Sequence, residues 1–256
     1  MNDINSIARL LADFISGNPL NKVPELSDMV IFQEPLVGIA SANDPLFIKL
    51  KHKEVVGPHH MTPTEWLPKA KTVISYFLPF SLRVRQSNHA NDGLPSTEWL
   101  YGRIEGEAFN NAMRKFLTEE IIKSGGKAIA PLHDPRYKVT DRRSNWSERH
   151  VAYIAGLGTF NLGKSFITKK GCAGRFGSVI TDLSLSPTVR PYQDIYEYCN
   201  NCGACIKRCP VFAISKNGKD HSPCADFVNA MKKKFEPRYG CGKCQTSVPC
   251  ETRIPS

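Results

Sequence analysis

Apolar residues recur at every fourth position in the middle of the chain, and this pattern predicts its longest helix. The helix is expected over residues 96–124. Its apolar stripe lies on one face and consists of Leu100, Ile104, Ala108, Ala112 and Phe116. Phe109, Met113 and Leu117 lie beside this stripe. Gly125 and Gly126 follow directly. A glycine pair favours the end of a helix, because glycine adopts the left-handed conformation common after the last turn.

Shorter apolar runs of strand length lie on both sides of this helix. They cover residues 35–41, 71–80 and 127–132, and residues 165–183 are expected to form a strand, a turn and a second strand. A short helix is expected after Thr62 or Pro63. Because helices alternate with strands, we predict an α+β fold with a layered α/β domain over residues 1–190.

Two further helices are expected at the edges of this domain. Residues 1–15 form an amphipathic pattern that we interpret as a docking helix. Residues 144–155 are expected to form a helix with Ser144 or Asn145 as its N-cap and Gly156 as its end. Prolines between residues 184 and 198 mark the passage into a second unit, a small ferredoxin-like domain predicted over residues 191–256.

Composition limits the class of protein. The chain has 256 residues, of which 41% are apolar, and a formal net charge of +10. No apolar run reaches the roughly 18 residues that cross a bilayer, and the N-terminus lacks the basic start of a secretory signal. We therefore expect a cytoplasmic protein without a membrane partner. The basic charge fits an anionic partner such as RNA or an acidic redox donor, and equally a solvated surface.

The stretch GLGTFNLGKS contains the spacing of a phosphate-binding loop, with Gly158, Gly163, Lys164 and Ser165 at the required positions. Such a loop must run from a strand into a helix. Here a predicted helix precedes the stretch and a predicted strand follows it. We therefore do not expect nucleotide hydrolysis.

Nine cysteines carry the strongest chemical signal. The cytosol keeps thiols reduced, so a large number of cysteines there indicates metal binding rather than disulfides. The run CNNCGACIKRCP has the spacing C-x2-C-x2-C-x3-C-P, with ligands Cys199, Cys202, Cys205 and Cys209. This spacing is typical of [4Fe-4S] ferredoxins, whereas zinc sites use paired C-x2-C knuckles without a crowded triplet.

Four more cysteines follow, which makes eight in the tail and predicts two [4Fe-4S] clusters. In two-cluster ferredoxins the fourth cysteine of the motif binds the other cluster. The same crossover here gives one group of Cys199, Cys202, Cys205 and Cys250, and a second group of Cys209, Cys224, Cys241 and Cys244, with a 16-residue insertion between Cys224 and Cys241. Cys172 has no partner near it in sequence and is interpreted as a small structural residue.

The tail segment YGCGKCQ and the earlier segment AYIAGLG, with FIT downstream, give the chain a family resemblance. It resembles epoxyqueuosine reductases, and in plan reductive dehalogenases. This resemblance implies a domain akin to the flavin nitroreductase fold that holds a cobamide, with FMN as the alternative, and two [4Fe-4S] clusters that supply it with electrons. Where the family has a D-Y-H triplet, the chain has residues 107–110 with the sequence EAFN.

The resemblance also implies roles for particular residues. Asp141 most nearly matches the proton donor of the family, and Glu148 is the substitute; both are candidate catalytic acids. Candidate cofactor-binding residues are Gly156, Leu157, Gly158, Arg149 and His150. We expect an oxidoreductase that reduces a small or tRNA-borne substrate and receives electrons from a redox donor protein. The alternatives are an electron-transfer module that only docks a partner, and an RNA-binding protein without chemistry.

Overall fold

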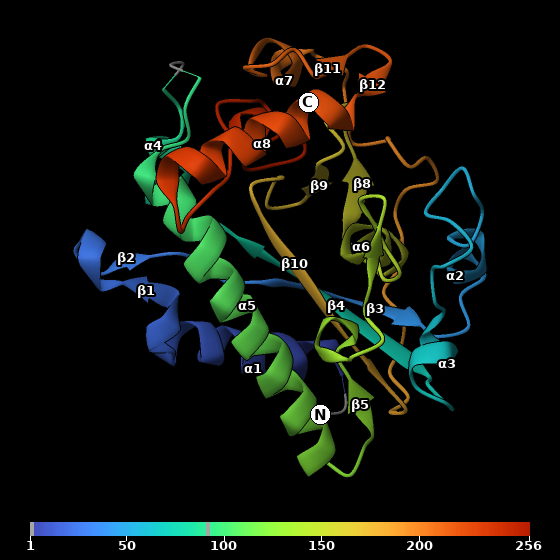
Figure 1. Cartoon of the computed structure of the whole chain (residues 1–256). Helices are drawn as coiled ribbons and strands as arrows, with labels where there is room; N and C mark the ends of the chain where they lie inside the picture. Colours follow the sequence, from blue (N-terminus) through green and yellow to red (C-terminus); the bar gives the residue numbers. More distant parts are fainter. Residues whose placement is uncertain (1–2, 91–92) are drawn as a thin grey trace.

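A computed structural model describes residues 3–90 and 93–256, and its centre is a four-stranded antiparallel sheet. The strands are β3 (Leu36–Ser41), β4 (Thr72–Pro79), β10 (Gly174–Thr181) and β5 (Ala128–Ile129), in the order β3-β4-β10-β5. β4 and β10 pair along their whole length, although about a hundred residues separate them in sequence. Figure 1 shows this sheet in the middle of the molecule, between layers of helix.

The two faces of the sheet bury different sets of side chains, as the alternation along a strand requires. Ile74, Tyr76 and Leu78 of β4 lie in the core cluster that α1 (Ile4–Gly17) and α5 (Thr97–Lys123) cover. Val73 lies in the cluster on the opposite face, under α2 (Leu46–Lys49), α3 (Pro63–Trp66) and α6 (Glu148–Ile154). The expected mixed α/β fold is thus confirmed, and its sheet is antiparallel.

The long helix α5 begins and ends where the sequence predicts. Ser96 caps it by accepting a hydrogen bond from the Trp99 amide, and Gly125 follows in the left-handed conformation with φ 87°. Its buried stripe differs from the main stripe expected from sequence. The helix buries Phe109, Met113, Leu117 and Ile121, whereas Ala108 faces solvent, because α5 packs on the sheet through the neighbouring row of side chains.

Several boundaries also differ from the sequence prediction. The helix expected from residue 144 begins at Glu148 with Ser147 as N-cap, because Arg143 and Ser144 form strand β7. The strand expected over residues 127–132 covers only Ala128–Ile129, because Pro131 begins a 3-10 turn. The remaining strands and short helix of this part are β1 (Lys22–Val23), β2 (Met29–Val30), α4 (Leu82–Ser87), β6 (Val139–Thr140), β7 (Arg143–Ser144), β8 (Gly158–Phe160) and β9 (Phe166–Thr168).

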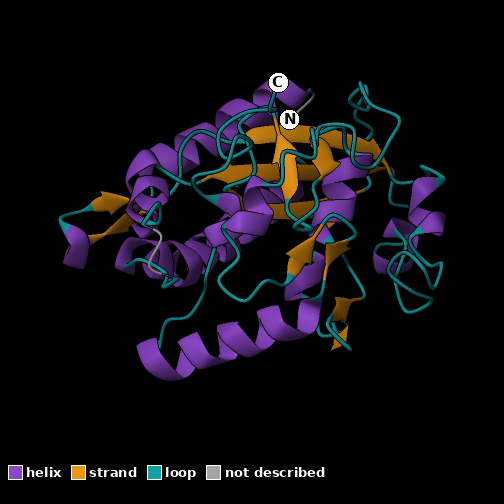
Figure 2. Ribbon diagram, turned by 90° about the horizontal axis from the view of Figure 1, so that it is seen from above, coloured by secondary structure: helices purple, strands orange, loops and turns teal. Residues whose placement is uncertain are grey.

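The cysteine-rich part consists of short elements and one longer helix. It contains α7 (Ala204–Lys207), β11 (Ile214–Ser215), β12 (Gly218–Lys219), α8 (His221–Phe235) and the 3-10 helix η4 (Lys243–Gln245). The sequence reading treated the segment of α8 only as an insertion between cysteines. Figure 2 shows α8 running along the outside of the molecule, and Met231 is its only fully buried residue.

Hydrogen bonds and ion pairs hold this part against the loop that follows α4. Arg208 donates to the Asn88 carbonyl at 3.0 Å, and Lys243 donates to the Ala90 carbonyl at 2.7 Å. Glu251 is buried and lies 3.4 Å from Arg85. The division at residues 190 and 191 stays a prediction. Within the described residues, no helix combines the length and the apolar character of a membrane span.

Candidate functional site

Four cysteines predicted to bind one cluster line the same small cavity. Cys199 and Cys202 come from the loop before α7, Cys205 lies in α7, and Cys250 lies near the C-terminal end. Asn161, from the loop between β8 and β9, lines the same cavity, and its side-chain amide lies 3.7 Å from the Cys250 sulfur. The fold therefore brings Cys250 to the triplet across more than forty residues of sequence.

The other four cysteines lie within electrostatic reach of one another. Burial, together with the nearby sulfurs of Cys244, Cys224 and Cys209, raises the pKa of the Cys241 thiol to about 12. The same burial raises the pKa of Cys244. The Cys209 sulfur also accepts a hydrogen bond from the Ala213 amide at 3.2 Å. These contacts give the second group that the crossover pattern predicts.

The donor set fits iron-sulfur clusters better than single metal ions. Among the residues that the structure describes, no three or more His, Cys, Asp or Glu side chains converge on one ion position. A zinc ion needs its four ligands around one point, whereas a four-iron cluster is held by thiolates on separate irons. The cysteines also lie among apolar side chains such as Ile167, Ile214 and Val248, which is a suitable setting for a cluster shielded from water.

Cys172 is a ninth thiol beside the first group. Its sulfur lies 3.8 Å from the Cys250 sulfur, and its amide donates to the Cys250 carbonyl at 2.9 Å. Gly171, with φ 80°, lets the chain approach this closely, because a Cβ there would lie 2.1 Å from the Glu251 carbonyl oxygen. Sequence distance concealed this contact, and no sequence signal pointed to it.

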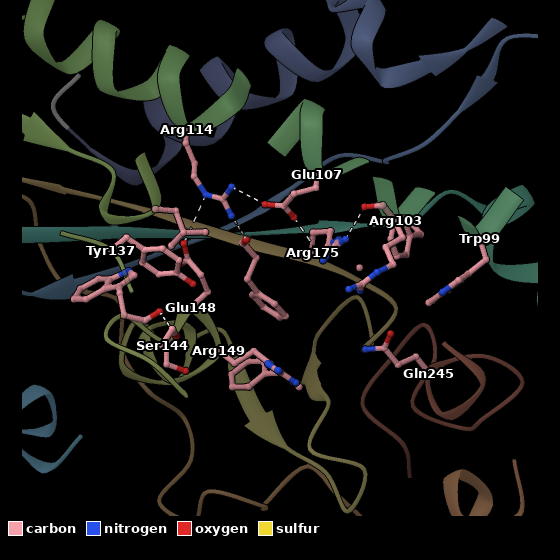
Figure 3. Close-up of a pocket in the computed structure, with 17 residues that line it drawn as sticks. Trp99, Arg103, Glu107, Arg114, Tyr137, Ser144, Glu148, Arg149, Arg175 and Gln245 are labelled. Atoms are coloured by element: carbon pink, nitrogen blue, oxygen red, sulfur yellow. Dashed lines mark hydrogen bonds and ion pairs between the residues drawn. The ribbon is translucent and has the colours of Figure 1, made fainter. Parts of the chain in front are cut away.

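A larger cavity of about 420 Å³ lies between the sheet and the cysteine-rich part (Figure 3). Helix α5 lines one wall with Trp99, Arg103, Glu107 and Arg114, and β10 contributes residues 174–176. Residues 146–149 at the start of α6 line the opposite side. Gln245 of η4 also lines the cavity and directly follows Cys244, so the cavity reaches the second cysteine group.

Glu148 is the carboxylic acid with the most unusual setting in this cavity. Its side chain is 14% exposed, and burial raises its pKa, although the Arg114 guanidinium opposes that effect. The Ser178 hydroxyl donates to Glu148 Oε2 at 2.7 Å, whereas Oε1 has no hydrogen-bond partner and lies 3.7 Å from Arg114 Nε. A buried carboxyl with a raised pKa holds its proton to higher pH than an exposed glutamate, which is what a proton donor requires.

Arg114 anchors the wall opposite Glu148. It is almost fully buried and donates to Glu107 Oε1 at 2.9 Å, to Asn111 Oδ1 at 2.8 Å and to the Phe176 carbonyl at 3.0 Å. Its Nε has no hydrogen-bond partner. Arg175 approaches the second oxygen of Glu107 at 3.5 Å, so one carboxylate serves two guanidinium groups.

The structure separates the two candidate acids. Asp141 lies in the exposed turn between β6 and β7, with φ 48°, and does not line the central cavity. The two arginines that follow it point to other partners: Arg142 donates to Ser222, and Arg143 to the Lys53 carbonyl. Glu148, the substitute candidate, is the acid that faces the cavity.

The candidate cofactor-binding residues are also divided. Arg149 lines the cavity and donates to the Lys164 carbonyl. His150 does not line it. Its Nδ1 lies 2.7 Å from the Ser147 hydroxyl, its ring packs on Phe160, and burial lowers its pKa to about 4.

The glycine turn after α6 packs against protein rather than into the cavity. A Cβ on Gly156 would lie 3.0 Å from Thr188, and one on Gly158 would lie 1.8 Å from the Ile167 carbonyl oxygen. Leu157 packs in a core cluster with Phe160 and Phe166. The expected helix-to-strand turn is present, but its glycines accommodate the chain's own backbone, so the expectation that these three residues contact a cofactor is not supported by their positions.

Other sequence features occupy structural positions. Lys164, of the phosphate-loop pattern, lies in the hairpin between β8 and β9 and donates to the Tyr196 hydroxyl at 2.6 Å. His60 is fully buried against Trp146, and burial lowers its pKa to about 3. Neither residue lines the central cavity.

The sequence reading missed the polar row on α5. Trp99, Arg103, Glu107 and Arg114 are spaced by four, four and seven residues, so they lie along one face of a helix. This period is visible in the sequence, but it is typical of any solvent-facing row. Nothing in the sequence shows that Arg175, some sixty residues away, completes the same wall.

Comparisons with known proteins agree with the cysteine pattern. Residues 192–215 match the family model described as a 4Fe-4S binding domain, which confirms the predicted iron-sulfur segment. The epoxyqueuosine reductase of Bacillus subtilis (strain 168) is 26% identical over 252 residues, which cover 93% of this chain and 59% of that protein. The resemblance to epoxyqueuosine reductases is confirmed. The chain spans about three fifths of the length of this relative.

Solved structures show the same fold. An epoxyqueuosine reductase crystallised with an epoxyqueuosine-modified tRNA stem loop gives a TM-score of 0.52 at 20% identity, covering 97% of this chain and 66% of that one. A catabolic reductive dehalogenase gives a TM-score of 0.56 at 17% identity, covering 86% of this chain and 30% of that one. The fold is therefore shared with both groups of enzymes.

Proposed function

We propose that this chain is an iron-sulfur oxidoreductase that passes electrons from two [4Fe-4S] clusters to an acceptor in the central cavity. The observation that carries the proposal is the contact between the cavity and the cysteine groups. Gln245 lines the cavity and follows Cys244, and the Gln245 carbonyl accepts a hydrogen bond from the Cys172 thiol. The second group therefore lies next to the cavity, which is the proposed place of the electron acceptor.

Each cluster, when bound, supplies one electron at a time. Cys199, Cys202, Cys205 and Cys250 hold one cluster in this proposal, and Cys209, Cys224, Cys241 and Cys244 hold the other. Apolar side chains pack around most of the sulfurs, whereas Cys202 is exposed. Asn161 and the Ala213 amide donate hydrogen bonds toward sulfurs of the two groups, which stabilises the negative charge of bound thiolates.

The lining of the cavity fits a planar cofactor. Phe176 is partly exposed in this lining and offers an aromatic face, whereas Trp99 and Phe166 are almost fully buried. Arg103 Nε and Arg114 Nε are buried polar atoms without a hydrogen-bond partner. The lining includes no histidine or cysteine that could ligate a cobalt ion. A cobamide, or FMN as the alternative, is therefore proposed to be held by stacking and hydrogen bonds, and when bound it supplies the electron-accepting centre.

Glu148 is assigned as the proton donor of the reduction. Its raised pKa keeps the carboxyl group protonated at higher pH than an exposed glutamate. The hydrogen bond from Ser178 fixes Oε2 and leaves Oε1 toward Arg114. Asp141 lies outside the cavity, so we give it no part in proton transfer.

The substrate is proposed to be a small molecule or a nucleoside carried on tRNA. Two features support an RNA-borne substrate: the formal charge of +10, and the tRNA stem loop bound by a structural neighbour. A redox protein is the proposed donor. The cavity favours an enzyme over an electron-transfer module, because a docking module needs no enclosed space that is lined by a buried acid.

An anaerobic spectroscopic experiment tests the function. We expect about eight irons per chain, and we expect the chemically reduced clusters to be reoxidised when cobalamin or FMN is bound and an acceptor substrate is added. Glu148→Gln should slow the reoxidation by about a hundredfold or more while leaving the iron content unchanged. One or two metals per chain, with zinc among them, contradicts the proposal; so does cluster reoxidation that neither cofactor accelerates.

A further inference from the structure

The central cavity holds more positive than negative side chains. Arg103, Arg114, Arg149 and Arg175 line it, and Glu107 and Glu148 are its only lining acids. The excess is two positive charges when both acids are ionised, and larger when Glu148 is protonated. Figure 3 shows that the arginines approach the space from both sides, with Arg114 and Arg175 on one wall and Arg149 on the other.

The two acids do not neutralise this set. Glu107 is shared by Arg114 and Arg175, and Glu148 Oε1 lies 3.7 Å from Arg114 Nε, beyond hydrogen-bond distance. Among the described residues, neither Arg103 nor Arg149 has a carboxylate within ion-pair distance: Arg103 lies 4.5 Å from the centre of the Tyr239 ring, and Arg149 donates to a carbonyl. Placing four guanidinium groups in a half-enclosed space with only two carboxylates costs free energy, which a bound anion recovers.

Arg114 supplies the second observation. It is almost fully buried, lines the cavity, and keeps its Nε without a hydrogen-bond partner. Arg103 Nε is also buried without a partner. A buried donor without a partner is costly, so a ligand that accepts from it is favoured. Guanidinium groups match the geometry of carboxylate and phosphate oxygens.

We propose that the cavity is a binding site for an oxyanion, a carboxylate or a phosphate, carried on a planar apolar body. The arginines hold the oxyanion, and the partly exposed ring of Phe176 packs on the body. The proposal adds a ligand class to the proposed function, and it rests on that function for the role of the ligand in the reaction. The group could belong to the cofactor or to the substrate, and these two sources have the same chemistry at the site.

Isothermal titration calorimetry on the anaerobically purified full chain, with its clusters intact and in buffer without phosphate or sulfate, tests the site. The probes are phenyl phosphate, benzoate and the neutral analogue benzyl alcohol. We expect one site for each anion and no measurable binding of benzyl alcohol. Arg175→Gln and Arg149→Gln should each weaken anion binding about tenfold, since one charged hydrogen bond accounts for roughly that factor.

Arg9→Gln is the matched control, because Arg9 is exposed on α1 and is not among the cavity residues. Arg149 is exposed and makes one hydrogen bond to a carbonyl, so its variant is expected to fold even where Arg175→Gln does not. If Arg9→Gln weakened anion binding as much as the cavity variants do, the anions would be attracted by the general positive charge of the protein, and the proposal would be overturned. Binding of benzyl alcohol as strong as that of the anions would also overturn it.

Loading the protein with cobalamin or FMN before titration identifies the source of the oxyanion. Loss of phenyl phosphate binding assigns the oxyanion subsite to the cofactor, and retained, arginine-dependent binding assigns it to the substrate. The titration involves no electron transfer. Absence of electron transfer would therefore contradict the proposed function and would not bear on the anion site. Failure of both anions to bind would contradict the anion site and would not bear on the proposed function.

Discussion

Cys172 contacts a proposed cluster ligand although 78 residues separate it from Cys250 in sequence. It is 1% exposed, and its backbone is tied to the same segment. In this contact the Cys172 thiol donates a hydrogen bond to the Cys250 sulfur. Hydrogen bonds to cluster sulfurs stabilise the reduced, more negative form of the cluster and so raise its reduction potential.

Cys172→Ala is therefore expected to shift the reduction potential of the cluster held by Cys250 to a more negative value. Cys172→Ser keeps a donor and should restore the potential at least in part. An anaerobic redox titration followed by electron paramagnetic resonance measures both variants, and the other cluster serves as the internal reference. Equal potentials in the alanine variant and the wild type would show that Cys172 only fills space.

Glu148 gives a second prediction, based on its raised pKa. The folded state holds this proton more tightly than the unfolded chain, whose glutamate has a pKa near 4.5. The stabilising effect is therefore present below pH 4.5 and is lost as the pH rises through the higher pKa of the folded protein.

Glu148→Gln cannot ionise, so its melting temperature relative to the wild type should rise with increasing pH across that interval. Thermal unfolding of both proteins under anaerobic conditions, in a series of buffers above pH 4.5, measures this difference. Loss of the Ser178 hydrogen bond changes the melting temperature of the variant by the same amount at every pH. The test is therefore how the difference in melting temperature between the two proteins changes with pH. A flat difference would contradict the assigned pKa direction.

At the level of elements, α5 shows how close packing depends on missing side chains. Gly106 lies against Phe32, and a Cβ there would approach the ring to 2.9 Å. Gly106→Ala should therefore destabilise the protein by about 1–3 kcal/mol through overpacking, despite the helix preference of alanine of about 1 kcal/mol. Gly17→Ala, at the end of α1, is the control, because nothing lies within 4 Å of the added carbon.

Chemical denaturation of the two variants measures this contrast. The expected order is Gly17→Ala at least as stable as the wild type and Gly106→Ala less stable. A stabilised Gly106→Ala would show that Phe32 moves without cost.

The elements that the sequence predicted share a strong local signal. The ends of α5 follow from a serine cap and a glycine pair, and β4 and β10 are strongly apolar runs. Helix α8 has one fully buried residue, so its apolar period is weak and its segment was read as an insertion. The buried face of α5 was misassigned because two adjacent apolar rows compete in its sequence, and only the position of the sheet decides between them.

The same contrast holds for the site. Cysteine spacing indicated the iron-sulfur segment because the first three ligands are local in sequence. The cavity depends on contacts between α5, β10 and α6, such as Arg114 with Glu148 and Arg175 with Glu107. A single sequence does not show which of these distant residues pair. The arginines could therefore not be identified as cavity residues before the fold was known.

At the scale of the whole molecule, the cysteine-rich part with α7, β11, β12 and α8 lies at one end of the layered part (Figure 1). Residues of both parts line the cavity. Cys250 closes the first group from the end of the chain, and Cys244 belongs to the second group beside the cavity. This arrangement gives the two cysteine groups, and the clusters that we propose they bind, different environments. Removing one ligand from each group should therefore give separable effects.

Cys250→Ala is expected to perturb the cluster of Cys199, Cys202 and Cys205 and to leave the other cluster's spectrum intact. Cys244→Ala should give the reverse pattern and should also slow electron delivery to the cavity, because Gln245 connects that group to the lining. Iron analysis with electron paramagnetic resonance of each reduced variant separates the two effects. If Cys250→Ala kept both clusters with unchanged potentials, the crossover assignment would fail, and Cys172, 3.8 Å from the lost sulfur, would be the first residue to examine as the replacement ligand.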